Sequence, residues 1–175
     1  MWQILPGIIA RKFVAVDAPL IMATVNVNRE YLRQWLPWLD GNTELNHFQK
    51  YIESCCLGYR EASSFLVGLW DEDSGCHIGN FGFNRLHEDH GEIGYWLAQN
   101  YTGRGIIHHA LIWLQKYGRK KFQLSEVTIR AATANERSRK VAQQLGFELL
   151  RIIPNNEWLY DHYVDHAEYC KRLAS

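Results

Sequence analysis

The sequence predicts an α+β fold in which a mixed, mostly antiparallel sheet of six to seven strands carries helices on both faces. Segments with the two-residue alternation of strands occur among segments with the 3.6-residue period of amphipathic helices. Three of the expected strands follow one another through short turns, which favours antiparallel pairing. Another pair is separated by a helix-length segment, which favours a parallel crossover and places a parallel pair inside the sheet.

The 175 residues are expected to form a single domain, 1–175, because this length can bury a substantial core. A composition that is 47% hydrophobic argues against disorder. The formal net charge is zero, so binding to nucleic acid is not expected. Neither a signal peptide nor an 18-residue apolar stretch is visible, so we expect a cytoplasmic protein without a membrane segment, and a homodimer stays open.

The cysteine and histidine spacings do not favour a metal site. No Cys-x-x-Cys pair occurs, and His87-x-x-His90 would need a further converging ligand to hold zinc. We therefore expect reduced thiols and no metal. The four cysteines are Cys55, Cys56, Cys76 and Cys170.

The first part of the chain is expected to form a strand and two helices. Residues 3–15 predict one strand, and a helix follows with Asp17 as its N-cap and Pro19 in its first turn. A second helix is expected after Thr43, which is also a favoured capping residue.

Two tryptophans lie between these helices, on either side of a proline. Pro37 breaks the helical pattern, so Trp35 and Trp38 fall at an element boundary. Large aromatic side chains there form either a plug of the core or the wall of a binding cleft. We regard both as candidate substrate-binding residues.

Three strands are then expected as an antiparallel meander. The first covers residues 64–70, a turn covers 71–75, and the second strand covers 76–86. The third is the stretch Gly91-Glu-Ile-Gly-Tyr-Trp-Leu97, in which apolar residues alternate with the others.

This third strand leads into the turn Tyr101-Thr-Gly-Arg-Gly105 and then into a helix. Gly103 and Gly105 lack a Cβ atom, so a ligand can approach the backbone closely. The first N–H groups of a helix have no partner within it, and the helix dipole adds partial positive charge. The turn is either a phosphate cradle or a strand-to-helix turn that binds nothing. Neither the dinucleotide fingerprint nor the nucleotide-triphosphate loop is present.

The last part of the chain predicts a strand, a short helix and a hairpin. The strand Glu126–Ala132 is expected to be parallel to the strand that ends at Leu97. Asn135 is expected to cap a helix over 136–145, with Gly146 just after its end. Residues 147–153 and 158–167 are expected as two strands joined by a turn at Pro154-Asn-Asn156.

In its order of elements the chain resembles the GNAT superfamily of acetyl-CoA-dependent N-acetyltransferases, and within it the ribosomal-protein N-terminal acetyltransferase branch. Asn100 stands where the superfamily pattern asks for Gln or Arg. The stretches that carry the resemblance are Leu32-Arg-Gln-Trp-Leu-Pro-Trp38, Gly91-Glu-Ile-Gly-Tyr-Trp-Leu97, Tyr101-Thr-Gly-Arg-Gly-Ile106 and Ala134-Asn-Glu-Arg-Ser-Arg-Lys-Val-Ala-Gln-Gln-Leu-Gly-Phe147.

The resemblance implies a fold in which the two parallel strands splay apart and receive the pantetheine arm of acetyl-CoA. The backbone at Leu97 would pair with that arm, and the Asn135 side chain would reach the pantetheine amide. Ser138 would protonate the leaving thiolate. Backbone amides would hold the pyrophosphate, with a further phosphate contact from the Arg104 side chain; these amides belong to Thr102, Gly103, Arg104, Gly105 and Ile106.

The implied reaction is direct attack of an amine on acetyl-CoA, without an acyl-enzyme. An α-amine, with a pKa of about 7.7–8.0, is neutral near pH 7 far more often than a lysine amine at about 10.4. A modest base is therefore sufficient, and Glu92 is the candidate. The expected acceptor is a protein N-terminus or an aminoacyl-like molecule. The alternatives are a small-molecule N-acetyltransferase acting on a polyamine, antibiotic or toxin, and a CoA-binding module without turnover.

Overall fold

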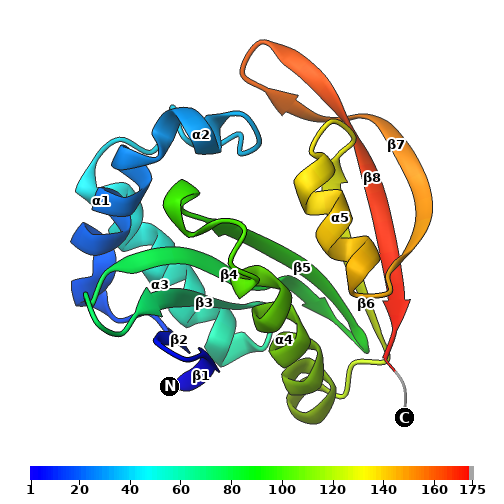
Figure 1. Cartoon of the computed structure of the whole chain (residues 1–175), viewed down its shortest axis with the longest axis horizontal. Coiled ribbons are helices and arrows are strands. Elements are labelled where there is room, and N and C mark those ends of the chain that lie inside the picture. Colours follow the sequence, from blue (N-terminus) through cyan, green and yellow to red (C-terminus); the bar gives the residue numbers. More distant parts are fainter. Residues whose placement is uncertain (174–175) are drawn as a thin grey trace.

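In the computed structural model, residues 1–173 are described, and their eight strands form one sheet in the order β1-β2-β3-β4-β5-β6-β8-β7 (Figure 1). Within these residues, β5 and β6 are the one parallel pair of neighbours. The predicted mixed, mostly antiparallel sheet is thereby confirmed. The strands are β1 Trp2–Leu5, β2 Ile8–Arg11, β3 Phe65–Asp71, β4 His77–His87, β5 His90–Leu97, β6 Glu126–Ala132, β7 Glu148–Leu159 and β8 His162–Arg172.

The strand count exceeds the predicted range because the N-terminal segment is a hairpin, not a single strand. Gly7 has a φ of 76°, a conformation that glycine adopts without strain, and it turns β1 back onto β2. β2 then pairs with β3, so the hairpin extends the edge of the predicted meander.

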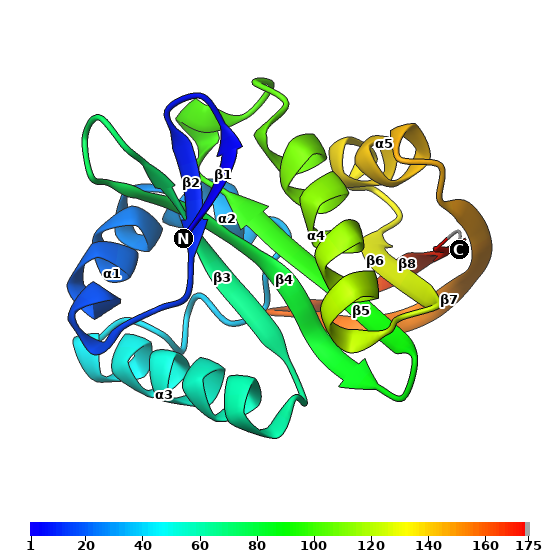
Figure 2. The same cartoon turned by 90° about the horizontal axis from the view of Figure 1, so that it is seen from below.

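Helices cover both faces of the sheet, as predicted (Figure 2). One face packs against α1, α2 and α3, and the other against α4 and α5. No helix within residues 1–173 is both long and apolar enough to cross a membrane. The helices are α1 Ala18–Val27, α2 Arg29–Arg33, α3 Leu45–Glu61, α4 Ile106–Phe122 and α5 Glu136–Gln144.

Each face of the sheet has its own hydrophobic core. Phe81, Ile93 and Leu111 are among the residues buried between the sheet and α4, whereas Ile21 and Ile52 belong to the cluster beneath α1 and α3. The sheet is thus held from both sides, and its backbone positions the residues of the site.

The predicted helix starts lie within two residues of the observed ones, but the residues that were expected to cap α1 and α3 do not do so. Asp17 precedes α1, yet its carboxylate accepts hydrogen bonds from Arg11 at 2.6 and 2.8 Å instead of capping the helix. The helix predicted after Thr43 begins at Leu45, with Glu44 at the N-cap position. The cap at Asn135 is formed as predicted.

The predicted turn at residues 154–156 is wrong. β7 continues through these residues to Leu159, and the chain turns between Leu159 and His162 instead. Pairing with β8 skips from Ile153 to Glu157, so the three residues form an irregularity within the strand. Asn155 adopts a φ of 48°, a conformation that asparagine tolerates better than most residues, which explains why a turn-like sequence is accommodated inside a hairpin.

A buried carboxylate joins the last three strands of the sheet. Glu168 on β8 is 3% exposed and accepts hydrogen bonds from Arg130 Nε on β6 at 2.7 Å and Arg151 Nε on β7 at 2.6 Å. Burial raises the pKa of this carboxyl, but the two guanidinium groups outweigh it and leave the pKa below its ordinary value.

We expect Glu168→Gln to lower the free energy of unfolding by about 2 kcal/mol at pH 7, because charge-assisted hydrogen bonds are lost. A depressed pKa contributes stability above the unfolded pKa of about 4.3, and this contribution disappears as pH falls through the folded value. Urea unfolding at pH 7 and pH 3 measures both effects, with Glu53→Gln on the exposed surface of α3 as control. An equal loss at both pH values would contradict this account.

Candidate active site

The parallel pair β5–β6 opens partway along its length (Figure 1). Pairing runs from His90 opposite Glu126 to Ile93 opposite Ile129. Beyond that point β5 continues to Leu97 and β6 continues to Ala132, but the two strands no longer pair with each other. On its other edge Leu97 stays paired with β4. The gap therefore exposes one edge of each strand to a ligand, as the predicted splay requires.

The loop after β5 presents free amides beside this gap. Gly103 and Gly105 have φ values of 78° and 74°, in the region that favours glycine. Among residues 1–173, no acceptor is recorded for the N–H groups at positions 103–106. These amides precede or begin α4, so they are donors at the positive end of a helix.

Two side chains of the loop are engaged with the protein itself. The Thr102 hydroxyl donates to Gln99 O at 2.7 Å, and the Thr102 N–H donates to the same oxygen at 3.2 Å. The Arg104 guanidinium donates to Asn100 O at 2.9 Å and lies 4.8 Å from the centre of the Tyr101 ring. The free backbone donors of the loop therefore begin at position 103, and the Arg104 guanidinium keeps further N–H groups beyond the one that bonds to Asn100.

Ser138 lies at the open part of the gap, in contact with β5. Asn135 Oδ1 accepts from Ser138 N at 3.1 Å, which fixes the first turn of α5. The Ser138 and Tyr95 hydroxyls are 2.8 Å apart, and Tyr95 also donates to Ser138 O at 3.2 Å. Burial raises the pKa of Tyr95 to about 12, so the phenol keeps its proton at neutral pH.

Glu92 lies apart from this pair, at the base of the gap. It belongs to the paired part of β5, opposite Thr128, and its carboxylate is 3.4 Å from Arg130 Nη1. Side chains alternate along a strand, so Glu92 points to the face opposite Tyr95. The structure thus brings Asn135 and Ser138 together, but it does not place Glu92 beside them.

A cavity of about 850 Å³ opens where β6 ends. Trp35 lines it, whereas Trp38 packs against Trp96 of β5 with ring centres 6.4 Å apart. The cavity contains three carboxylates, of which Asp161 contacts His162 at 2.6 Å, and its arginine is paired with Asp40 at 2.8 Å. These charges favour the binding of a cationic amine in the cavity. The lining residues are Glu30, Arg33, Gln34, Trp35, Ala132, Thr133, Ala134, Leu159, Tyr160, Asp161, His162, Tyr163, Val164 and Asp165.

The sequence interpretation missed Tyr95. Tyr95 alternates in register with the apolar residues Ile93 and Leu97, a signal that indicates an inward-facing hydroxyl. The cavity has no comparable signal, because its walls are about 120 residues apart along the chain.

A sheet that opens at a parallel pair, with free amides at one end of the gap and a hydroxyl pair within it, defines a protein built to hold an extended, phosphate-bearing substrate. Residues 8–148 match the family model described as "Acetyltransferase (GNAT) domain". The chain belongs to the GNAT acetyltransferases, which confirms the predicted acetyl-CoA-dependent transferase class.

Individual relatives agree with this assignment. The chain is 28% identical over 150 residues to the ribosomal-protein-serine acetyltransferase of Escherichia coli (strain K12), covering 85% of this chain and 83% of that one. Two solved structures share the fold. RimL, a ribosomal L7/L12 alpha-N-protein acetyltransferase in complex with coenzyme A, has a TM-score of 0.91 at 21% identity, covering 98% and 97% of the two chains. The microcin C7 self-immunity acetyltransferase MccE, in complex with acetyl-CoA and AMP, has a TM-score of 0.89 at 20% identity, covering 97% and 94%.

Proposed function

We propose that this protein transfers the acetyl group of acetyl-CoA to the N-terminal α-amine of a protein, with a ribosomal protein as the acceptor class and the cytoplasm as its location. The cavity supports the proposal, because three carboxylates line it and it reaches Ala132, the last residue of β6. The relative from Escherichia coli is named for a ribosomal-protein acceptor, and RimL likewise.

In this proposal the gap and the loop hold the acetyl donor. The free amides at 103–106 bind the diphosphate, because backbone N–H groups at a helix start match its charge and geometry. The pantetheine arm lies along the unpaired edge of β5, where the backbone at Leu97 bonds to it as a neighbouring strand would. The Asn135 amide group caps α5 and faces the same arm.

The chemical step is attack of the neutral amine nitrogen on the thioester carbonyl carbon. The C–N bond forms, the C–S bond breaks, and the electron pair leaves with sulfur. Ser138 donates its hydroxyl proton to that sulfur and regains a proton, through water, from those that the amine nitrogen releases. Tyr95 stays protonated throughout and holds the Ser138 oxygen by a hydrogen bond. A thiol pKa of about 8.5 means that a weak acid is sufficient for this task.

The amine must lose one proton before it attacks, and its nitrogen loses a second after the C–N bond forms, which gives the neutral amide. We assign this proton transfer to Glu92, acting through water from the base of the gap. Its carboxylate lies 3.4 Å from Arg130 Nη1, in the paired part of β5. An α-amine needs only this modest assistance, because about one in ten is already neutral at pH 7.

Calorimetry and an amine panel test the proposal together. We expect acetyl-CoA to bind with a Kd below millimolar, and acetyl transfer to peptides with a free N-terminus and blocked lysines to exceed transfer to diamines. The same peptides with a blocked N-terminus serve as control. Preference for a diamine would replace the acceptor assignment, and binding without turnover would leave a CoA-binding module.

A further inference from the structure

The tip of the β7–β8 hairpin is fastened to the segment that follows α2. The Tyr160 hydroxyl donates to Leu36 O at 2.5 Å and accepts from Leu39 N at 3.2 Å. These are backbone groups more than 120 residues away in the chain. One phenol thus satisfies both a donor and an acceptor of a loop that has no regular pairing of its own.

Tyr160 adopts an unfavourable backbone conformation to reach this position. Its φ is 63°, in the left-handed region that bulky residues rarely adopt. The preceding strand ends at Leu159, and Asp161 N donates back to Leu159 O at 2.8 Å. A strained residue persists where surrounding contacts hold it, and here those contacts come from the side chain.

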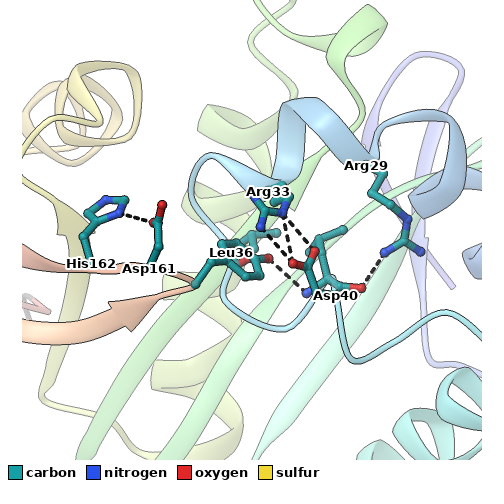
Figure 3. Close-up of polar contacts among 8 residues, drawn as sticks. Arg29, Arg33, Leu36, Asp40, Asp161 and His162 are labelled. Atoms are coloured by element: carbon teal, nitrogen blue, oxygen red, sulfur yellow. Dashed lines mark hydrogen bonds and ion pairs between the residues drawn. The ribbon is translucent and has the colours of Figure 1, made fainter.

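The loop that receives Tyr160 is held in place by two arginines of α2 (Figure 3). Arg29 donates to Leu39 O and, at 3.1 Å, to Asn42 O. Arg33 forms a forked pair with Asp40, with nitrogen–oxygen distances of 2.8–3.2 Å. The loop that carries Leu36 and Leu39 is therefore held by contacts that do not involve the hairpin.

Charged groups of the two walls also meet at this contact. The Arg33 guanidinium lies 3.8 Å from the centre of the Tyr160 ring, a cation–π geometry. Asp161, which pairs with His162 at 2.6 Å on the hairpin, is close enough for Arg33 to contribute to the depression of its pKa, after the larger effect of His162 (Figure 3). Arg33 of α2 thus attracts both the Tyr160 ring and the Asp161 carboxylate at the hairpin tip.

This contact lies at the junction of the two cavity walls. Arg33 and Trp35 line one side of the cavity, and the hairpin residues from Leu159 to Asp165 line the other. We propose that Tyr160 is a positioning residue that fixes the hairpin as a wall of the acceptor cavity and so determines how tightly the acceptor chain is held. This inference rests on the proposed function, whose acceptor binds in that cavity.

The test is Tyr160→Phe, which removes the hydroxyl and keeps the ring under Arg33. We expect the acceptor-peptide KM to rise about tenfold, the amount that corresponds to one or two lost hydrogen bonds. The kcat and the Kd for acetyl-CoA should change less than twofold. Hydrogen exchange of the Leu39 amide and of residues 157–164 should accelerate in the same variant.

Tyr59→Phe is the matched control, because the Tyr59 hydroxyl of α3 also donates to a backbone oxygen of another element, Leu66 O of β3, away from the cavity. It should leave the acceptor KM unchanged.

Tyr160→Gly separates the effect on stability from the effect on the position of the hairpin. It relieves the backbone strain at this residue but should raise the acceptor KM as Tyr160→Phe does. An unchanged KM in Tyr160→Phe, or an equal rise in Tyr59→Phe, would overturn the proposal. If the wild type acetylates no peptide, the proposed function fails, and hydrogen exchange alone then decides whether Tyr160 fixes the hairpin.

Discussion

Replacing Ser138 by alanine is expected to lower kcat for acetyl transfer by about a hundredfold or more. The reason is geometric: Ser138 is fixed by the Asn135 cap and by the Tyr95 hydroxyl at the open part of the β5–β6 gap. Loss of a positioned proton donor commonly costs about 10²–10⁴ in rate. Steady-state kinetics with saturating acetyl-CoA measures the effect, and calorimetry should show an unchanged Kd for acetyl-CoA.

Two further variants make this experiment decisive. Tyr95→Phe keeps the Ser138 hydroxyl but removes its partner, so a smaller loss of about tenfold is expected from one weakened hydrogen bond. Ser125→Ala removes a serine hydroxyl that bonds to Asp89, outside the gap, and should leave kcat unchanged. A Ser138→Ala enzyme within twofold of the wild-type kcat would remove Ser138 from the chemistry.

Introducing a carboxylate into the loop before α4 is expected to weaken acetyl-CoA binding by about a hundredfold. Gly105→Asp places a negative charge among amides that we assign to the diphosphate. There is room for the side chain, since a Cβ atom at this position would meet only His109, at 3.6 Å or more. Aspartate also tolerates a positive φ better than most residues.

Gly105→Asn separates charge from backbone strain. Asparagine has nearly the same shape as aspartate and would have to adopt the same φ of 74°, but it carries no charge. We expect its Kd for acetyl-CoA to rise only a few-fold, with a melting temperature equal to that of the aspartate variant. Equal Kd values for the two variants would show that the loop does not hold the diphosphate.

Local signals in the sequence predicted much of the fold. The bounds Glu126–Ala132 of β6 were predicted correctly because a clean alternation lies between a helix and an N-cap. The turn at residues 154–156 was placed wrongly because proline and asparagine favour turns locally, whereas pairing with β8 resumes at Glu157 and carries the strand onward. A neighbouring strand overrode a local preference there.

In the candidate site, too, the sequence indicated the features that depend on neighbouring residues but not the contacts between residues far apart in the chain. Glycines and an N-cap indicated the loop and Asn135, which depend on short-range backbone geometry. The pairing of Tyr95 with Ser138 joins residues 43 positions apart, and no periodicity encodes it. The acceptor cavity depends on Tyr160 meeting Leu36, a contact between residues 124 positions apart along the chain.

The opening between β5 and β6 is bounded at both ends. Four residue pairs join the strands at the base, while Tyr160 and the bond from Arg137 to the Tyr31 hydroxyl, at 3.2 Å, connect the two sides farther up. Such a frame admits the free end of a chain, which can thread into it, more readily than the middle of a folded segment. Selectivity for termini would then arise from the outline of the enzyme itself, before any side chain of the acceptor is recognised.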